Sequence, residues 1–491
     1  METLDIILCS AILGILLVAF RKRGQSDDDT IPTVSSFLPW IGRAIEYGSN
    51  SFEYLLKCEA QYGPAFKLHL AGRKFIVFCN EEGINDTLKD TSRAFTTYTS
   101  HRQLLDALGG VKQDAGVLMH DRLFPVISRA FSTADGVASL APSFNKTIYS
   151  LLSSLEQNIS GSSDVHLLHF VGENFYSATS KVVFGSGFPT DTYSDYYTVD
   201  NHFVLLMSPI PFTGRAVKRA RDRLVRAIED YIQRSWKNSR LEGASAMATE
   251  MYQKIRGRRL SPSDEAGVIL TVMWGLHSNV INTSYWLFAY VLADTPSFLR
   301  VREEIDSTLR TRFNGDINEF LSSSSASHNL PLLDSAIKET LRFVILMHSL
   351  REAQKDTTIS FGEGQTAVIR EGDLVLLYPG AASRTFRSGR ELDRFCVDRY
   401  LPNEKTSNEG SSGIQPPFWG FGSGTRMCKG KYLALHELRV FFVTCVYLFD
   451  MKLVDENGSA VQGPLPPTDP RSLGAARPSK SMFLRMSRRL K

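Results

Sequence analysis

A ten-residue segment near the C-terminus, 421–430 (FGSGTRMCKG), places one cysteine among closely spaced glycines. The glycines Gly422, Gly424 and Gly430 allow bare backbone to approach both the Cys428 sulfur and a flat macrocycle. Apolar residues follow Cys428 at helical spacing, so the cysteine is predicted to lie at a helix N-terminus. There the unpaired amides and the positive end of the helix dipole favour a thiolate. A glycine-rich turn around an ordinary buried cysteine is the alternative, but the segment as a whole fits a thiolate ligand.

The segment resembles the haem-binding signature of the cytochrome P-450 family, Phe-x-x-Gly-x-Arg-x-Cys-x-Gly. The matching residues are Phe421, Gly424, Arg426, Cys428 and Gly430. The resemblance implies haem b (iron protoporphyrin IX) as the cofactor, with Cys428 as the axial ligand of the iron. It also implies that Phe421 shields the sulfur from water and that Arg426 pairs with a haem propionate.

Two further segments resemble the same family. Glu339 and Arg342 lie three residues apart in a predicted helix and therefore share a face, as in the family's Glu-x-x-Arg. Arg399 matches the arginine of Phe-x-Pro-Glu-Arg-Phe, although Val397 replaces the proline. The resemblance implies that Glu339, Arg342 and Arg399 form a structural network that locks the loop leading to Cys428.

The arginine of residues 349–353 (SLREA), Arg351, occupies by resemblance a strand position whose arginine binds a haem propionate. An exposed strand arginine is the alternative. The family's usual tryptophan-and-arginine pair near residues 95–130 is not evident. His120, Arg122 and Arg129 are the candidates for a second propionate partner.

A long central helix is predicted from Ser261, whose hydroxyl caps the helix and precedes Pro262 and two acids. The helical pattern reaches Asp294, and Pro296 follows its end. At ~1.5 Å per residue this helix is on the order of 45 Å long. The resemblance implies that it crosses the distal face of the haem.

The core of this helix departs from the family, where an acid and a threonine usually relay protons to bound dioxygen. Alignment of residues 274–286 (WGLHSNVINTSYW) puts Ser278 at the acid and Asn279 at the threonine, which makes both candidate catalytic residues. An amide holds a water or a substrate oxygen but does not relay a proton as a hydroxyl does. His277 is a candidate acid, or else an ordinary core histidine.

Asn279, seven residues before Trp286, is similar to one branch of the family: the sterol and oxysterol hydroxylases of bile-acid synthesis, and prostacyclin synthase. The stretches 37–42 and 62–66 resemble the same branch, so the resemblance runs from about residue 32 to the C-terminus. It places distal substrate contacts in roughly 95–130, 200–215, the central helix and 471–482.

The resemblance implies a membrane-bound haem-thiolate monooxygenase that inserts oxygen from O2 into a hydrophobic substrate. A steroid, a terpenoid or another lipid-like biosynthetic metabolite is expected. One alternative is a haem-thiolate isomerase that rearranges a peroxide without a reductase, which Asn279 also fits. A non-catalytic haem sensor is a second alternative, but the sequence offers no output domain for it.

Electrons must come from another protein, because the chain has no dinucleotide-binding glycine motif at the start of a helix. The expected donor is NADPH through a separate NADPH-cytochrome reductase, with cytochrome b5 as a further donor. Lys429, where the family usually has an apolar or small residue, and Lys431 are expected on the proximal face. They either attract an acidic partner or serve only as solubilising lysines.

Residues 1–23 are predicted to form a membrane signal anchor with a basic stop. An apolar run over 6–20 follows Glu2 and Asp5 and precedes the basic residues 21–23 (RKR). Because positive charge stays on the cytosolic side, a catalytic domain over 24–491 is expected in the cytosol. A single-pass protein of the endoplasmic reticulum membrane, in contact with membrane lipid, is therefore predicted. A hairpin that lies in one leaflet is the alternative.

The remaining composition fits one large helical enzyme. The chain has 491 residues, 43% of them hydrophobic, and a net charge of +4, which is too small to suggest nucleic acid as a partner. Short strands are expected at 67–70 with 75–78, at 357–360 with 367–369, and at 374–378. The predicted class is mainly α with a small β region, the cytochrome P-450 fold, preceded by one N-terminal transmembrane helix.

Overall fold

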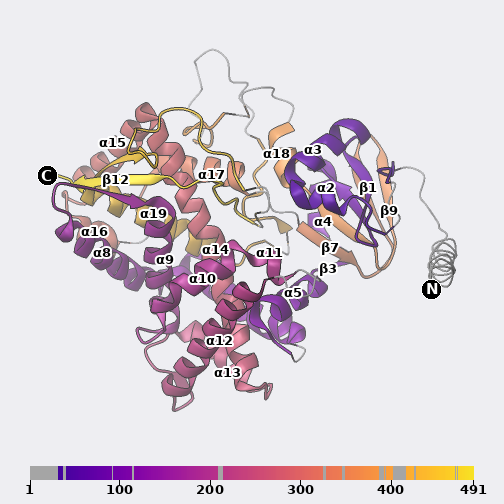
Figure 1. Cartoon of the computed structure of the whole chain (residues 1–491), viewed down its shortest axis with the longest axis horizontal. Coiled ribbons are helices and arrows are strands. Elements are labelled where there is room, and N and C mark those ends of the chain that lie inside the picture. The colour runs from indigo at the N-terminus through magenta and orange to yellow at the C-terminus, as the bar shows by residue number, and fades with distance from the viewer. Residues whose placement is uncertain are drawn as a thin grey trace, which may run out of the picture.

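A computed structural model of the chain describes most of the sequence (Figure 1). The described residues are 31–36, 40–90, 92–112, 115–207, 214–323, 328–345, 349–385, 392, 394–401, 416–424, 427–469, 472 and 474–490. For residues 381, 384 and 385 the structure describes the backbone but not the side chain. The predicted anchor over 1–23 and Arg426 lie outside these residues, as do parts of the segments 37–42, 95–130, 200–215 and 471–482.

Helices make up most of the described chain. The first are α2 (Ala44–Ser49), α3 (Ser51–Tyr62), α4 (Glu81–Lys89), α5 (Tyr98–Leu104), α6 (Phe124–Phe131), α7 (Ala134–Ala138), α8 (Ala141–Asn158), α9 (Leu167–Phe184), α10 (Tyr193–Asn201), α11 (Phe203–Leu206) and α12 (Arg215–Ser235). The others are α13 (Ala246–Arg256), α14 (Pro262–Ala293), α15 (Thr295–Arg312), α16 (Ile317–Ser322), α17 (Pro331–Val344), α18 (Pro379–Thr385) and α19 (Lys431–Leu448). Two π-helical segments, Leu105–Gly109 and Leu118–Leu123, and a 3-10 turn, Thr190–Thr192, connect them.

The strands are short. They are β1 (Ala65–Leu70), β2 (Arg73–Phe78), β3 (Phe95–Thr96), β4 (Ser162–His166), β5 (Trp236–Lys237), β6 (Arg240–Leu241), β7 (Ser349–Ala353), β8 (Thr357–Gly362), β9 (Gln365–Ile369), β10 (Leu374–Leu377), β11 (Phe449–Val454) and β12 (Phe483–Arg488). The predicted strand pairs are confirmed, since β1 pairs with β2 and β8 with β9, both antiparallel.

The largest sheet has the strand order β1-β2-β10-β7-β3, so it joins the N-terminal strands to strands that follow α17. β10 runs parallel to β2, with Val375 opposite Ile76, and antiparallel to β7, with Val375 opposite Arg351. Figure 1 shows this sheet with α2, α3 and α4 at one end of the molecule and the helical body at the other. The mainly helical architecture with a small β region is as predicted.

The helix α14 runs through the helical body and is buried over most of its 32 residues. Its start is as predicted: Ser261 Oγ accepts a hydrogen bond from the Asp264 amide at 3.1 Å, and Pro262 opens the first turn. Helices α9, α12, α17 and α19 all pack against it. A helix with apolar residues on nearly every face needs such neighbours on all sides. This burial makes any exposed position in its middle conspicuous.

Within the described residues, no helix is both long enough and apolar enough to cross a membrane. The predicted anchor over residues 1–23 lies outside those residues, so the anchor and the boundary of the catalytic domain at residue 24 stay predictions.

The contact between α14 and the π-helical segment Leu105–Gly109 depends on two glycines. A Cβ on Gly267 would collide with the Gly109 carbonyl, and a Cβ on Gly109 would lie 2.6 Å from the Gly267 oxygen. Gly275, two turns along the same helix, has no described atom within 4 Å of a built Cβ. The two glycines of α14 therefore differ in packing but share a helical backbone.

We expect Gly267→Ala to lower the free energy of unfolding by about 1–3 kcal/mol, because backbone must move to admit the methyl group. Gly275→Ala is the matched control and should raise that free energy by up to about 1 kcal/mol through helix propensity. Urea unfolding of both variants measures the difference. Equal midpoints would show that the close approach of the two segments is not required.

Candidate active site

Cys428 lies in a closed loop just before α19, whose N-cap is Gly430. The Cys428 amide donates a hydrogen bond to the Phe421 carbonyl at 2.8 Å, which brings the two ends of the loop together. The ring of Phe421 is half-buried and packs edge-on against Phe418, with ring centroids 6.3 Å apart. The residue Cys428 itself is exposed. The backbone hydrogen bond therefore ties the cysteine to Phe421, while the residue itself remains exposed.

Opposing effects act on the pKa of the Cys428 thiol. Enough protein surrounds the thiol that burial raises its pKa, although the residue is exposed by area. A hydrogen bond from the Gly430 amide and the charge of Lys429 lower that pKa, but they do not outweigh burial. The predicted helix is present, yet its first residue, Lys431, comes three positions after the cysteine. The protein groups described around the sulfur therefore favour the thiolate only in part.

The glycines of the loop differ in their physical role. Gly424 has φ +65°, and a Cβ there would collide with the Leu88 carbonyl at the end of α4. Gly422 also has positive φ, at +69°. Among the described atoms, a Cβ on Gly430 would meet the Cys428 sulfur alone, at an ordinary 3.9 Å. Gly424 thus lets the loop pack on α4, while Gly430 lies directly beside the sulfur.

The structure brings Glu339, Arg342 and Arg399 together in a buried cluster. Arg342 Nε and Arg399 Nε each lie 2.8 Å from a Glu339 oxygen, and the side chains of Glu339 and Arg342 are 0% and 1% exposed. The Cys396 amide adds a hydrogen bond to Glu339 Oε1 at 3.1 Å. One carboxylate therefore joins α17 to the 396–399 segment.

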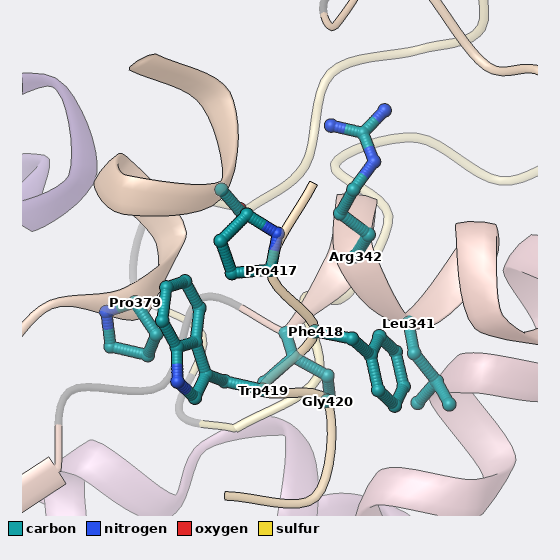
Figure 2. Close-up of a pocket in the computed structure, with 9 residues that line it drawn as sticks. Leu341, Arg342, Pro379, Pro417, Phe418, Trp419 and Gly420 are labelled. Carbon is teal, nitrogen blue, oxygen red and sulfur yellow. The ribbon is translucent and has the colours of Figure 1, made fainter. Parts of the chain in front are cut away.

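The loop that leads to the cysteine runs past the end of α17 beside this cluster. Figure 2 shows Phe418 next to Leu341 and Trp419 next to Pro379. A Cβ on Gly420 would lie 3.0 Å from Leu341 Cβ, and Trp419 Nε1 donates a hydrogen bond to Asn85 Oδ1 at 3.1 Å. The position of the cysteine loop is thus set by α17 and by α4.

Arg351 lies at the middle of β7 and is buried, with 7% of its surface exposed. Its Nη1 donates hydrogen bonds to Ser349 Oγ at 2.8 Å and to the Leu350 carbonyl at 2.9 Å. Of the other candidates for a propionate, Arg122 is exposed and Arg129 pairs with Glu250 at 2.7 Å on the surface. His120 lies in the second π-helical segment.

No local pattern predicts a partner for His120, but the structure places His101 beside it. The His101 Nδ1 and His120 Nε2 atoms are 2.8 Å apart, and both rings pack edge-on against Phe124. One imidazole of such a pair must be neutral to accept the proton of the other.

Asn279 lies on an open face of α14. Asn279 and Gly275 are exposed, and because they are four residues apart they share one side of a helix that is otherwise largely buried. Asn279 Oδ1 accepts a hydrogen bond from the Ala475 amide at 2.8 Å. The structure therefore sets the polar end of Asn279 on an accessible surface in the middle of the molecule.

Ser278 lies on a different side of the helix and is buried, so the structure does not bring it together with Asn279. Its hydroxyl donates a hydrogen bond to Asp200 Oδ1 at 2.6 Å. Trp274 Nε1 donates to the same oxygen at 2.8 Å, and Arg477 Nε lies 3.6 Å from Asp200 Oδ2. Successive residues of a helix are separated by about 100°, which explains the separation.

His277 is fully buried, and its Nε2 shares a hydrogen bond with Ser180 Oγ at 2.9 Å. Burial lowers the pKa of His277 to about 3, because the cation is poorly solvated there. The imidazole is neutral near pH 7 and does not lie on the face that carries Asn279. This placement fits a core histidine.

Sequence reasoning missed Asp200 and the part that residues 474–477 play around Asn279. Asp200 is 78 positions from Ser278, and Ala475 is 196 positions from Asn279. No periodic pattern links residues so far apart. The range 471–482 was expected to contact substrate, but nothing in its composition indicated a hydrogen bond to the central helix.

The donor set around Cys428 fits a haem. No cluster of three or more His, Cys, Asp or Glu side chains that could hold a metal ion occurs among the described residues. A single accessible thiol that accepts an amide hydrogen bond is instead suited to a metal whose other ligands come from a macrocycle. Cys428 would hold the iron, and the buried guanidinium of Arg351 is suited to a propionate.

Comparisons with known proteins agree over almost the whole chain. The family profile described as cytochrome P-450 matches residues 32–473. The 7-alpha-hydroxycholest-4-en-3-one 12-alpha-hydroxylase of Oryctolagus cuniculus is 24% identical over 94% of this chain and 93% of that protein. The cholesterol 7-alpha-monooxygenase of Cricetulus griseus is 21% identical over 92% of each.

Among solved structures, a chain described as retinoic acid bound cyanobacterial CYP120A1 matches with a TM-score of 0.70. The match covers 94% of this chain and 99% of that one, at 19% sequence identity. At this level of identity the likeness concerns the fold alone.

We expect Glu339→Gln to lower the free energy of unfolding by roughly 3–5 kcal/mol, because two guanidinium groups would keep their charge without a buried counter-ion. The control is Glu303→Gln, which breaks an exposed pair with Arg310 and should change stability little. Urea unfolding monitored by circular dichroism compares the two variants. If both unfold at the wild-type midpoint, the buried cluster does not hold this part of the fold.

Proposed function

The chain belongs to the cytochrome P-450 family, whose profile matches residues 32–473. We propose that it is a monooxygenase that hydroxylates a steroid-like metabolite. The observation that carries the proposal is the accessible thiol of Cys428 in a loop fixed by α17 and α4. The similarity to sterol hydroxylases over more than nine-tenths of the chain supports the substrate class. A terpenoid or another lipid-like molecule of biosynthetic origin has the same hydrophobic character.

In the proposed reaction, the residues of the chain hold the haem and orient the groups around it. Cys428 is the iron ligand, and the Gly430 amide stabilises its negative charge. The Glu339 cluster keeps the ligand loop in place, and Arg351 holds a propionate. When bound, the haem supplies reductive activation of dioxygen and transfer of one oxygen atom to the substrate. Asn279 holds a water or an oxygen atom at the open face of α14, but relays no proton through its own amide.

The electron donor is proposed to be NADPH through a separate NADPH-cytochrome reductase, with cytochrome b5 as a further donor. Lys429 and Lys431 would face an acidic surface of that partner. At the start of α19 the Lys431 ammonium lies 5.7 Å from the Tyr432 ring, and Tyr432 is 41% exposed. An aromatic residue beside lysines fits a surface that binds another protein.

The enzyme is proposed to act at the endoplasmic reticulum membrane, anchored once by residues 1–23, with its catalytic domain in the cytosol. Large hydrophobic residues are exposed in two places that support contact with lipid. One holds Trp40 and Ile45, which are 61% and 65% exposed and follow the predicted anchor. The other holds Val204, Leu205 and Met207, at 39–44% exposure, on and just after α11.

A peroxide isomerase that needs no reductase is the second candidate, and the amide of Asn279 favours it. A group that binds oxygen atoms without relaying protons suits a substrate that already carries its oxygen. The two functions differ in whether electrons and O2 are consumed.

We expect Cys428→Ser to abolish the red-shifted Soret band of the reduced carbon monoxide complex, because a serine oxygen does not replace the thiolate. Cys396→Ser is the control, since Cys396 lies in the same part of the chain and donates to Asp398 Oδ1 as a serine hydroxyl would. The control should keep the band. An unchanged spectrum in Cys428→Ser would refute the ligand assignment.

We expect the protein to convert a sterol-type substrate into a product heavier by one oxygen atom, and only with NADPH, reductase and O2 present. Comparing apolar metabolites of the native host with those of a strain lacking the gene identifies that substrate. The accumulated precursor should be lighter than the lost product by one oxygen. A precursor of equal mass, converted by the purified protein without reductase, would establish the isomerase instead.

A further inference from the structure

The side-chain amide of Asn279 is held in one orientation by a backbone group. Its Oδ1 accepts a hydrogen bond from the Ala475 amide at 2.8 Å. A backbone N–H only donates, so the atom that faces it must be the amide oxygen and not the nitrogen. The usual ambiguity between the oxygen and nitrogen of an asparagine is therefore removed by chemistry at this position.

The NH2 group of Asn279 is left for another partner. No described residue accepts a hydrogen bond from Nδ2, and Asn279 is exposed. One turn earlier on the same face, a Cβ on Gly275 would have no described atom within 4 Å. The two hydrogens of Nδ2 are thus available as donors at the open face of α14, while the oxygen is turned toward the Ala475 amide.

Gly474 makes this orientation possible. It has φ +79°, and a Cβ there would collide with Asn279 Oδ1, so only glycine leaves room for the amide oxygen. Any larger residue would have to push the amide away from Ala475 or displace the backbone.

The segment that carries Gly474 has little freedom to move aside. The Ala476 amide donates to the Val344 carbonyl at 2.7 Å, and Trp286 Nε1 donates to the Ala476 carbonyl at 2.7 Å. Arg477 Nη1 donates to the Asn201 carbonyl at 3.1 Å. Hydrogen bonds to α10, α14 and the end of α17 therefore fix the segment behind Asn279.

We propose that Gly474 and Ala475 are positioning residues that lock the Asn279 amide as a hydrogen-bond donor, so that the site favours an acceptor oxygen there. The inference rests on the proposed function, because it places the open face of α14 beside substrate and haem. The acceptor is an oxygen atom of the substrate, such as a ketone, or of a ligand at the iron. A threonine hydroxyl at this position would donate and accept from the same atom, whereas the locked amide keeps its oxygen at Ala475 and leaves its NH2 group to donate.

Two variants remove the donor in different ways. Asn279→Asp keeps the shape and the acceptor for the Ala475 amide but replaces NH2 with an oxygen. Gly474→Ala leaves Asn279 in the chain and crowds its amide oxygen. The control for the first is Asn457→Asp, the same chemical change in an exposed turn. The control for the second is Gly364→Ala, where φ is +76° but no described atom lies within 4 Å of a built Cβ.

The first measurement is the infrared C–O stretch of the reduced carbon monoxide complex without substrate. A donor to the bound ligand lowers this frequency, so we expect a shift to higher frequency in Asn279→Asp and in Gly474→Ala, and none in the controls. The second measurement is the Kd of a 3-keto steroid and of its 3-deoxy analogue from the substrate-induced spin-state spectrum. Losing one hydrogen bond should reduce the preference for the ketone by roughly tenfold.

If only the C–O stretching frequency shifts, the acceptor is a ligand at the iron. If only the preference for the ketone changes, the acceptor is the substrate. Either result supports the proposal. The proposal fails if Asn279→Asp, with its Soret band intact, keeps both the wild-type C–O stretching frequency and the wild-type ketone preference. It also fails if Asn279→Asp changes these two quantities but Gly474→Ala, equally loaded with haem, does not. A wild-type protein without the red-shifted Soret band would overturn the proposed function, and this inference with it.

Discussion

The buried carboxylate of Glu339 is the point on which the cysteine side of the molecule depends. Two guanidinium groups and one backbone amide converge on its oxygens, at distances between 2.8 and 3.1 Å. Charges buried this deeply are tolerated only when every partner is present, so the cluster fixes α17 and the 396–399 segment relative to each other. Leu341, next to Arg342, then sets the place of the loop that carries Cys428. A structural ion pair thereby helps to place the loop that carries the Cys428 thiol.

Successive residues of the central helix α14 point to different sides, so a buried structural polar group and an accessible one can be neighbours in the chain. Ser278 and Asn279 are neighbours in the chain, yet Ser278 is buried against Asp200 and Asn279 is exposed. The buried side needs Asp200 because Trp274 Nε1 and the Ser278 hydroxyl would otherwise lack an acceptor. The open side needs Gly474, which leaves space for the Asn279 oxygen. The same helix thus supports the fold on one face and can serve the reaction on another.

Burial raises the pKa of the Cys428 thiol, and the Gly430 amide and the Lys429 charge lower it without outweighing burial. A catalytic cysteine that acts as a nucleophile usually has the opposite surroundings, with a base or a strong positive field beside it. An exposed cysteine without such surroundings, just before α19, agrees with the proposed role as the ligand of a cation that itself stabilises the thiolate.

Features that depend on a local pattern of residues could be predicted from the amino-acid sequence. The cap at Ser261 and the apolar run behind it predicted α14, and the residues after Cys428 predicted α19. The short strand pairs β1–β2 and β8–β9 were also predicted. The spacing of Glu339 and Arg342 predicted their shared helix face. Only the tertiary structure decided which polar groups meet across the chain, because packing brings together residues such as Asn279 and Ala475 that no local pattern relates. It also separated Ser278 from Asn279, since the side of a helix that stays open depends on what packs against the others.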